Sequence, residues 1–196
     1  MQPPLRLPLR LHLLHKLSWR LGWMLPLCLA LLLGTPAGRA QGVEATALHL
    51  NRGEAGLTLD FSARLTLSRS IEDALQRGVP MYFSAQATLW RSRWYWRDER
   101  VARANRTWRL SYQPLTASWR VALGALSQNY ASLGEALAVV ASIGRWKLAE
   151  SGALDPDEHY YVEFSYRLDT SQLPRPMQIG LGGDWSLGLE RTLQVD

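Results

Sequence analysis

The stretch between Trp90 and Arg109 has the residue types and spacing best suited to binding chemistry in this chain. Seven arginines occur in it against two acidic residues, Asp98 and Glu99. Arginine side chains bind carboxylates and phosphates through two parallel hydrogen bonds, and they stack on aromatic rings. The candidate binding residues are Arg91, Arg93, Trp94, Trp96, Arg100, Arg103 and Arg109. This stretch is therefore predicted to bind an anionic partner, either an envelope component such as lipid headgroups or an acidic protein segment.

The same stretch also fits an ordinary strand hairpin without a binding role. In that interpretation the tryptophans belong to the core and the arginines line the solvated face, as charge runs usually do. If Arg91 and Arg93 share one strand face and Arg109 projects from a paired strand, the three guanidinium groups form one patch. Arg100 and Arg103 would then lie near the connecting turn.

Other groups that could do chemistry give weaker signals. Asp155, Asp157, Glu158 and His159 form the densest cluster of potential metal ligands, but Asp-Pro-Asp is typical of a turn and the spacing does not match a calcium loop. Ser186 lies in a sequence that only loosely resembles a nucleophile elbow, and a triad would have to combine it with His159. No metal or other cofactor is predicted. The predicted function is that of a non-enzymatic periplasmic binding or accessory domain, and the alternative is an envelope hydrolase whose site is assembled from residues distant in sequence.

Alternating apolar and polar residues indicate how these groups are positioned. The alternation is clearest over residues 57–67 and recurs over residues 108–112, 119–123, 160–168 and 185–195. Such a period is typical of an antiparallel sheet with one wet face. The chain is therefore predicted to be mainly β, an antiparallel β-sandwich or partly open barrel of about seven or eight strands with two short helices.

Three local signals refine this expectation. Ser70 and Gly78 bracket a short helix over residues 70–77, and a capping box that begins at Ser132 introduces a second one over residues 136–143. Both helices are expected to cover a sheet edge or one end of the sandwich. Between residues 81 and 97 the apolar parity changes, which predicts a bulge or bend near Arg91 in a long strand that turns a corner.

The first forty residues resemble a targeting signal. A basic start is followed by an apolar run over residues 21–34, and Gly38 and Ala40 supply small residues for cleavage. We expect a secretory signal peptide over residues 1–40 and a single β-rich periplasmic domain over residues 41–196. The alternative is an uncleaved signal that anchors the chain in the inner membrane.

Removal of this leader changes the charge and redox chemistry of the chain. Five of the 22 Lys and Arg residues lie in the leader, so 17 remain against 17 Asp and Glu. Removal of the leader therefore removes the net positive charge of the chain. Because an exported protein is also separated from the chromosome, nucleic acid is excluded as a partner. The only cysteine, Cys28, also lies in the leader, which excludes disulfides and zinc–thiolate sites from the exported chain.

Two segments of the exported part resemble a known family. They are WRLSYQPLTASWRV at residues 108–121 and LDTSQLPRP at residues 168–176. They are similar to a proteobacterial exported family known mainly as a domain of unknown function, whose members have been labelled proline-rich signal-peptide proteins. The resemblance implies an exported, β-rich protein. It also implies an inner-membrane sensor kinase as a partner, because genes of this family often lie beside one, and it supplies no catalytic residues.

Overall fold

Strands dominate the part of the chain that the computed structural model describes, residues 42–178 and 182–196. The strands are β1 (Gly42–Gly53), β2 (Gly56–Thr66), β3 (Met81–Arg91), β4 (Glu99–Gln113), β5 (Ser118–Leu123), β6 (Leu126–Tyr130), β7 (Ser142–Ala149), β8 (Tyr160–Leu168) and β9 (Gly188–Val195). The predicted mainly β, sandwich-like class is confirmed, with nine strands in the described residues and no closed barrel among them. The predicted signal peptide lies outside the described residues.

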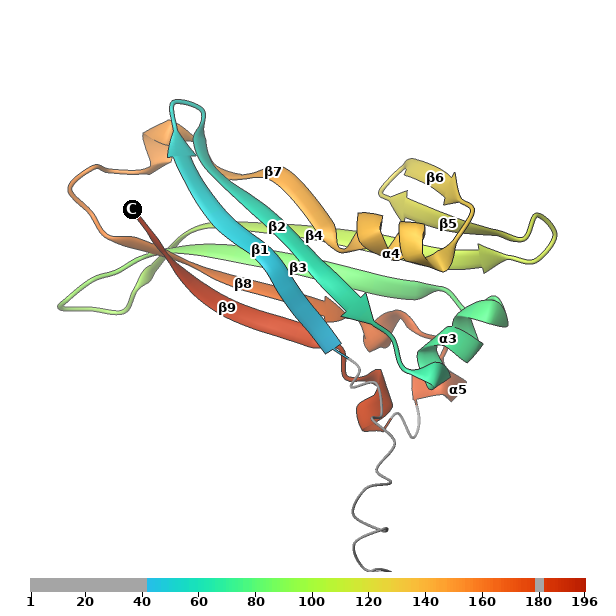
Figure 1. The fold of residues 1–196 in the computed structure, drawn as a ribbon. Coiled ribbons are helices and arrows are strands. Elements are labelled where there is room, and N and C mark those ends of the chain that lie inside the picture. The colour runs from blue at the N-terminus through green and yellow to red at the C-terminus, as the bar shows by residue number, and fades with distance from the viewer. Residues whose placement is uncertain (1–41, 179–181) are drawn as a thin grey trace, which may run out of the picture. The chain divides into compact units, whose positions relative to one another are not determined.

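The strands form two antiparallel sheets (Figure 1). The larger sheet has the order β6-β5-β4-β3-β8-β9, and the smaller has the order β1-β2-β7. All neighbouring strands are antiparallel. Because side chains alternate along each strand, one face of the large sheet is apolar and the other is polar. We call the apolar face the inner face and the polar face the outer face.

The core lies between the two sheets. Phe61 of β2 contacts Phe164 and Tyr166 of β8, with ring centroids 4.8 and 5.2 Å apart. The buried Tyr166 hydroxyl donates a hydrogen bond of 3.1 Å to the carbonyl of Val140. Each strand thus supplies the apolar face that its alternation predicted.

Short helices cover the ends of these sheets. Helix α3 (Arg69–Gln76) is capped by Ser68, whose hydroxyl accepts a hydrogen bond from the Ile71 amide, rather than by Ser70 as predicted. Helix α4 (Leu133–Val140) is capped by Ser132 as predicted, but it ends earlier because β7 begins at Ser142. The remaining helical turns are η1 (Ser151–Ala153), η2 (Thr170–Gln172), α5 (Arg175–Gln178) and η3 (Gly183–Trp185). Within the described ranges, no helix is both long enough and apolar enough to cross a bilayer.

The predicted long strand over residues 81–97 is shorter in the structure. The pairing of β3 with β4 shifts between Leu89 and Trp90, so the expected bulge is present. The strand then ends at Arg91 and does not turn a corner. The chain instead reverses through residues 92–98 into β4, which places the tryptophan-rich segment in a hairpin loop.

Candidate functional site

The loop between β3 and β4 exposes three consecutive aromatic residues, Trp94, Tyr95 and Trp96, which we call the aromatic tip. Their side chains are 95%, 66% and 74% exposed. The interpretation that placed the tryptophans of this stretch in the core is therefore wrong for Trp94 and Trp96, although it holds for Trp108, which is buried. In Figure 1 the loop extends beyond the strands beside it. The aromatic tip is thus a protruding apolar surface at one end of the large sheet.

Hydrogen bonds at the base of the loop hold it to strand β8. The Asp98 carboxylate accepts a hydrogen bond of 3.1 Å from the Arg93 amide and one of 2.7 Å from the Tyr161 hydroxyl. The Ser92 amide donates to the carbonyl of His159 at 2.9 Å. None of these bonds involves an aromatic side chain of the tip. The loop conformation is therefore set by polar groups at its base.

These bonds shift the pKa values of both partners. The hydrogen bond from Tyr161, and then that from the Arg93 amide, lowers the pKa of Asp98 because each stabilises the carboxylate. The same bond, followed by burial and the charge of Asp98, raises the pKa of Tyr161 to about 12. Asp98 is thus held as a carboxylate and Tyr161 as a neutral phenol at neutral pH.

A second acidic residue, Glu99, binds two of the candidate arginines. The Arg91 Nε donates to Glu99 Oε2 at 3.0 Å, and the terminal nitrogens of Arg91 and Arg93 contact the same carboxylate oxygen. The hydrogen bond from Arg91 is the main reason that the pKa of Glu99 is lowered. The guanidinium groups of Arg91 and Arg93 therefore already have a carboxylate partner within the molecule. Their ion pairs hold Glu99, the first residue of β4, in place.

The other candidate arginines lie on the outer face. Arg100 is paired with Trp90, Arg103 with Thr88 and Arg109 with Tyr82. Residues that are directly opposite in a sheet project to the same side, and Trp90 alternates with the buried Leu89. These arginines therefore project away from the core and are solvent-exposed.

The expected single patch of Arg91, Arg93 and Arg109 is not formed. Arg109 is opposite Tyr82, nine positions along β3 from Arg91. At about 3.3 Å per residue this separation is about 30 Å. The physical reason is the antiparallel register, which places residues close to the turn opposite one another and residues far from the turn at the other end of the hairpin.

The guanidinium groups of Arg97 and Arg100 differ from those of Arg91 and Arg93. Both residues are exposed, and neither makes an ion pair or side-chain hydrogen bond with any residue in the described part of the chain. Arg103 donates to the side chain of Gln86 instead. Arg97 and Arg100 are therefore the cations closest in sequence to the aromatic tip that remain available to an external anion.

Arg106 has a role that the sequence did not reveal. It is paired with Ala85 on the inner face, and its guanidinium carbon lies 5.4 Å from the centroid of the Trp146 ring of β7. Burial lowers its pKa. Arg106 thus joins the two sheets through a cation–π contact, and only the register of β4 distinguishes it from its exposed neighbours.

The acidic segment beside the hairpin forms a turn. The Asp155 carboxylate accepts a hydrogen bond of 3.0 Å from the Asp157 amide, which is the turn geometry that Asp-Pro-Asp predicted. Across residues 42–178 and 182–196, no group of three or more His, Cys, Asp and Glu residues is arranged to hold a metal ion.

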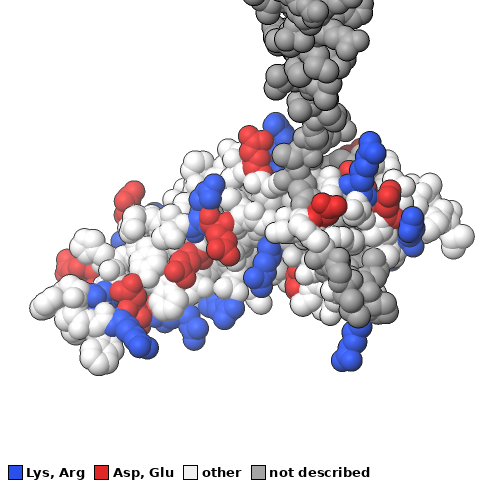
Figure 2. All heavy atoms as spheres, turned by 90° about the horizontal axis from the view of Figure 1, so that it is seen from below, with Lys and Arg blue, Asp and Glu red and all other residues white. Residues whose placement is uncertain are grey.

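The acidic segment also affects the charge environment of the hairpin. Glu158 lies near enough to Arg91 to contribute, after Glu99, to the raised pKa of the Arg91 guanidinium. Figure 2 shows basic and acidic side chains interspersed over the visible face.

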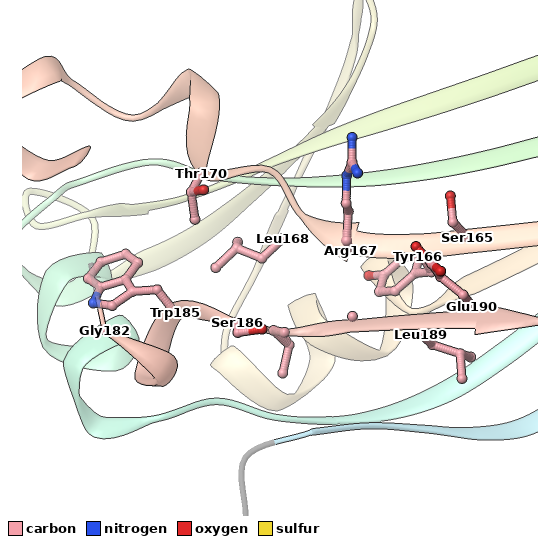
Figure 3. A pocket seen from close by; sticks show the side chains of 12 residues that line it. Ser165, Tyr166, Arg167, Leu168, Thr170, Gly182, Trp185, Ser186, Leu189 and Glu190 are labelled. Atoms are coloured by element: carbon pink, nitrogen blue, oxygen red, sulfur yellow. The ribbon is translucent and has the colours of Figure 1, made fainter. Parts of the chain in front are cut away.

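A separate hollow of about 560 Å³ lies over β8, β9 and the helical turns η2 and η3 (Figure 3). Its polar lining includes Ser165, Arg167, Ser186 and Glu190. His159 comes directly before the first residue of β8 and Ser186 lies beside its last residues, so the two are about 30 Å apart at the usual rise per residue. The two residues cannot form the Ser–His pair of a triad.

Comparisons with known proteins identify the family. No curated protein and no solved structure matches the chain. The family described as domain of unknown function DUF4390 matches residues 40–194, which is well over half of the chain. That range includes the hairpin, the acidic turn and both segments that carried the resemblance. The chain therefore belongs to the DUF4390 family, a domain of unknown function.

Proposed function

We propose that this chain is an exported, non-enzymatic envelope protein whose β-rich domain binds an anionic partner through the β3–β4 hairpin. The observation that carries the proposal is the aromatic tip, where three exposed rings are followed by Arg97 and Arg100, two cations that pair with no residue in the described part of the chain. Exposed aromatic and arginine side chains are the residues that contribute most to binding at interfaces. The partner is an anionic component of the envelope or an acidic protein segment.

The internal bonding of the loop supports this choice. Asp98 is bonded to Tyr161, and Glu99 is bonded to Arg91 and Arg93. These two carboxylates are therefore not free to pair with Arg97 and Arg100. An arrangement that exposes rings and cations while it holds its own acids at the loop base suits recognition of an external anion.

The proposals of export to the periplasm and of a sensor kinase as partner rest on separate observations. The leader over residues 1–40 supports export to the periplasm, and the family resemblance supports an inner-membrane sensor kinase as a partner. Intact mass measurement of the protein recovered from the envelope tests export. A chain that begins within a few residues of Gln41 is expected, whereas a full-length chain held in the inner membrane would favour the uncleaved anchor.

The binding proposal is tested with the exported product and two arginine variants. The double substitution Arg97→Gln and Arg100→Gln should weaken binding to vesicles of phosphatidylcholine and phosphatidylglycerol, or to polyglutamate, by about tenfold. The control is Arg109→Gln, which removes another exposed arginine about 30 Å away and should leave binding unchanged. Binding should also weaken between 0.1 M and 1 M salt, since the Debye length falls from about 10 Å to about 3 Å. If the double variant binds as tightly as the Arg109→Gln control, the proposal is refuted.

An envelope hydrolase is the second candidate, and the hollow over β8 and β9 is the observation that favours it. Ser165, Ser186, Arg167 and Glu190 line that hollow together. In Figure 3 the side chains of Ser165 and Arg167 point to the same side of β8. Screening the exported product against ester, amide and glycoside substrates tests this candidate, and any activity should be lost in Glu190→Gln.

A further inference from the structure

We infer that the aromatic tip enters the interfacial region of a lipid bilayer, so that the partner of the hairpin is an anionic membrane surface. This inference rests on the proposed binding function and names its partner. It concerns only Trp94, Tyr95 and Trp96 with the arginines that follow them. The exported domain would then attach to a membrane surface by the end of the β3–β4 hairpin.

The first ground is the chemistry of the tip. Trp94 and Tyr95 pack edge to face with ring centroids 5.2 Å apart, and the three side chains donate no hydrogen bond to any described residue. Each ring therefore presents an apolar body together with an unused N–H or O–H group. Such side chains are enriched where acyl chains meet headgroups, because there the ring is shielded from water while its polar atom stays hydrated.

The second ground is shape. The loop over residues 92–98 extends past the strands beside it (Figure 1), and its three most exposed side chains are consecutive. A folded protein partner would need a concavity that matches this protrusion. A bilayer needs none, because its headgroup region deforms around an inserted side chain.

The third ground is the order of polarity along the hairpin. The aromatic tip is followed directly by Arg97, which pairs with no described residue, and the internally bonded carboxylates of Asp98 and Glu99 come next, before Arg100. A bilayer surface has the same order, with apolar chains beneath phosphates and water beyond them. The guanidinium group of Arg97, next to the tip, would meet lipid phosphates when the rings are inserted.

The acidic turn limits how the hairpin can attach. Asp157 and Glu158 are exposed, and the Ser92–His159 hydrogen bond holds their segment against the base of the loop. An acidic protein segment lying along the hairpin would meet these carboxylates and be repelled. A bilayer that contacts only the tip would not be repelled by these carboxylates. This favours attachment through the rings over broad electrostatic adsorption.

A probe on the tip tests the inference. The full chain with Cys28→Ser carries an environment-sensitive NBD group either at Tyr95→Cys or at the control position Leu115→Cys. Leu115 is fully exposed in the turn between β4 and β5, at the other end of the hairpin. The leader is present in both proteins, so the difference between the two probe positions reports the tip.

With vesicles of equal parts phosphatidylcholine and phosphatidylglycerol, the probe at position 95 should shift its emission to the blue. Lipids brominated on their acyl chains should quench it. The probe at position 115 should do neither. Trp94→Ser with Trp96→Ser, made in the Tyr95→Cys protein, should abolish the shift without lowering the melting temperature, because both tryptophan side chains are largely exposed.

The outcomes separate this inference from the function on which it rests. A probe at position 95 that stays in water, on a chain whose vesicle binding still requires Arg97 and Arg100, would overturn insertion and retain anion binding. A probe that stays in water on a chain whose vesicle binding no longer requires Arg97 and Arg100 would overturn both the insertion inference and the proposed anion binding. A blue shift that appears only with polyglutamate, and not with vesicles, would assign the tip to an acidic protein and overturn the membrane inference.

Discussion

The hydroxyl of Tyr161 lies 2.7 Å from a carboxylate oxygen of Asp98 and donates a hydrogen bond to it. Tyr161 belongs to β8 and Asp98 to the β3–β4 loop, so this bond joins two segments 63 residues apart in the sequence. The same carboxylate accepts the Arg93 amide. Together with the hydrogen bond from the Ser92 amide to the His159 carbonyl, Asp98 therefore fixes the position of the aromatic tip relative to β8.

Acid should release the loop. The pKa of Asp98 is lowered from 3.8 in the folded protein, so its contribution to loop order is complete above about pH 4 and is lost as the pH falls through the folded pKa. Amide hydrogen exchange of Arg93 should accelerate in that range. Asp98→Asn should show fast exchange at neutral pH, and an unchanged exchange rate in this variant would contradict the assigned role of the carboxylate.

Tyr161 should titrate later than an ordinary tyrosine. Its pKa is raised from 10.0 to about 12, because the neutral phenol donates to Asp98 and the phenolate would be repelled by it. The bond therefore persists below pH 10 and is lost as the pH rises through about 12. NMR titration of labelled tyrosine rings should detect this shift, and Asp98→Asn should lower the Tyr161 pKa towards 10.

Phe164 should be a major contributor to stability. Its ring is buried and contacts Phe61 across the two sheets at 4.8 Å. Phe164→Ala should lower the free energy of unfolding by about 3–5 kcal/mol, because it removes apolar contacts and leaves a cavity. Ser165→Ala changes the next residue, which projects from the outer face, and should alter stability by less than about 0.5 kcal/mol. Urea unfolding of both variants measures the difference, and similar losses would mean that the faces of β8 are assigned wrongly.

Gly56 should not tolerate a side chain. It begins β2 with φ +105°, and a Cβ atom there would lie 2.1 Å from the carbonyl oxygen of Ala149 in β7. Gly56→Ala should therefore cost at least about 2 kcal/mol, from backbone strain and from displacement of β7. Gly53, its partner across the β1–β2 turn, has open space around its Cα. Thermal unfolding should show a large loss for Gly56→Ala and little change for Gly53→Ala.

Local patterns predicted the strands and helices because their causes are local. The alternation over residues 57–67 and 160–168 becomes β2 and β8, with Phe61 and Phe164 on the buried faces. The capping box at Ser132 begins helix α4. Burial of one strand face and satisfaction of the first helical amides depend on neighbours in the sequence, so the residues alone indicate them.

The aromatic tip was harder to predict because two tryptophans in the same stretch have opposite environments. Trp108 is buried opposite Phe83, whereas Trp96 follows the end of β3 and is exposed. Residue type and spacing are similar in the two cases. Only the place where β3 stops, which depends on its pairing with β4 and β8, distinguishes them.

Sequence by itself determined the mainly β class, the presence of two short helices, the Asp155 turn and the concentration of arginine and tryptophan in one hairpin. Tertiary structure alone decided what each arginine does. The register between β3 and β4 places Arg91 beside Glu99 and Arg109 at the far end of the hairpin. It also places Arg106 on the inner face, where its guanidinium group packs on the Trp146 ring. The physical reason is that a guanidinium group has the same chemistry at every position, so its role is set by which strand lies opposite and which carboxylate is within reach.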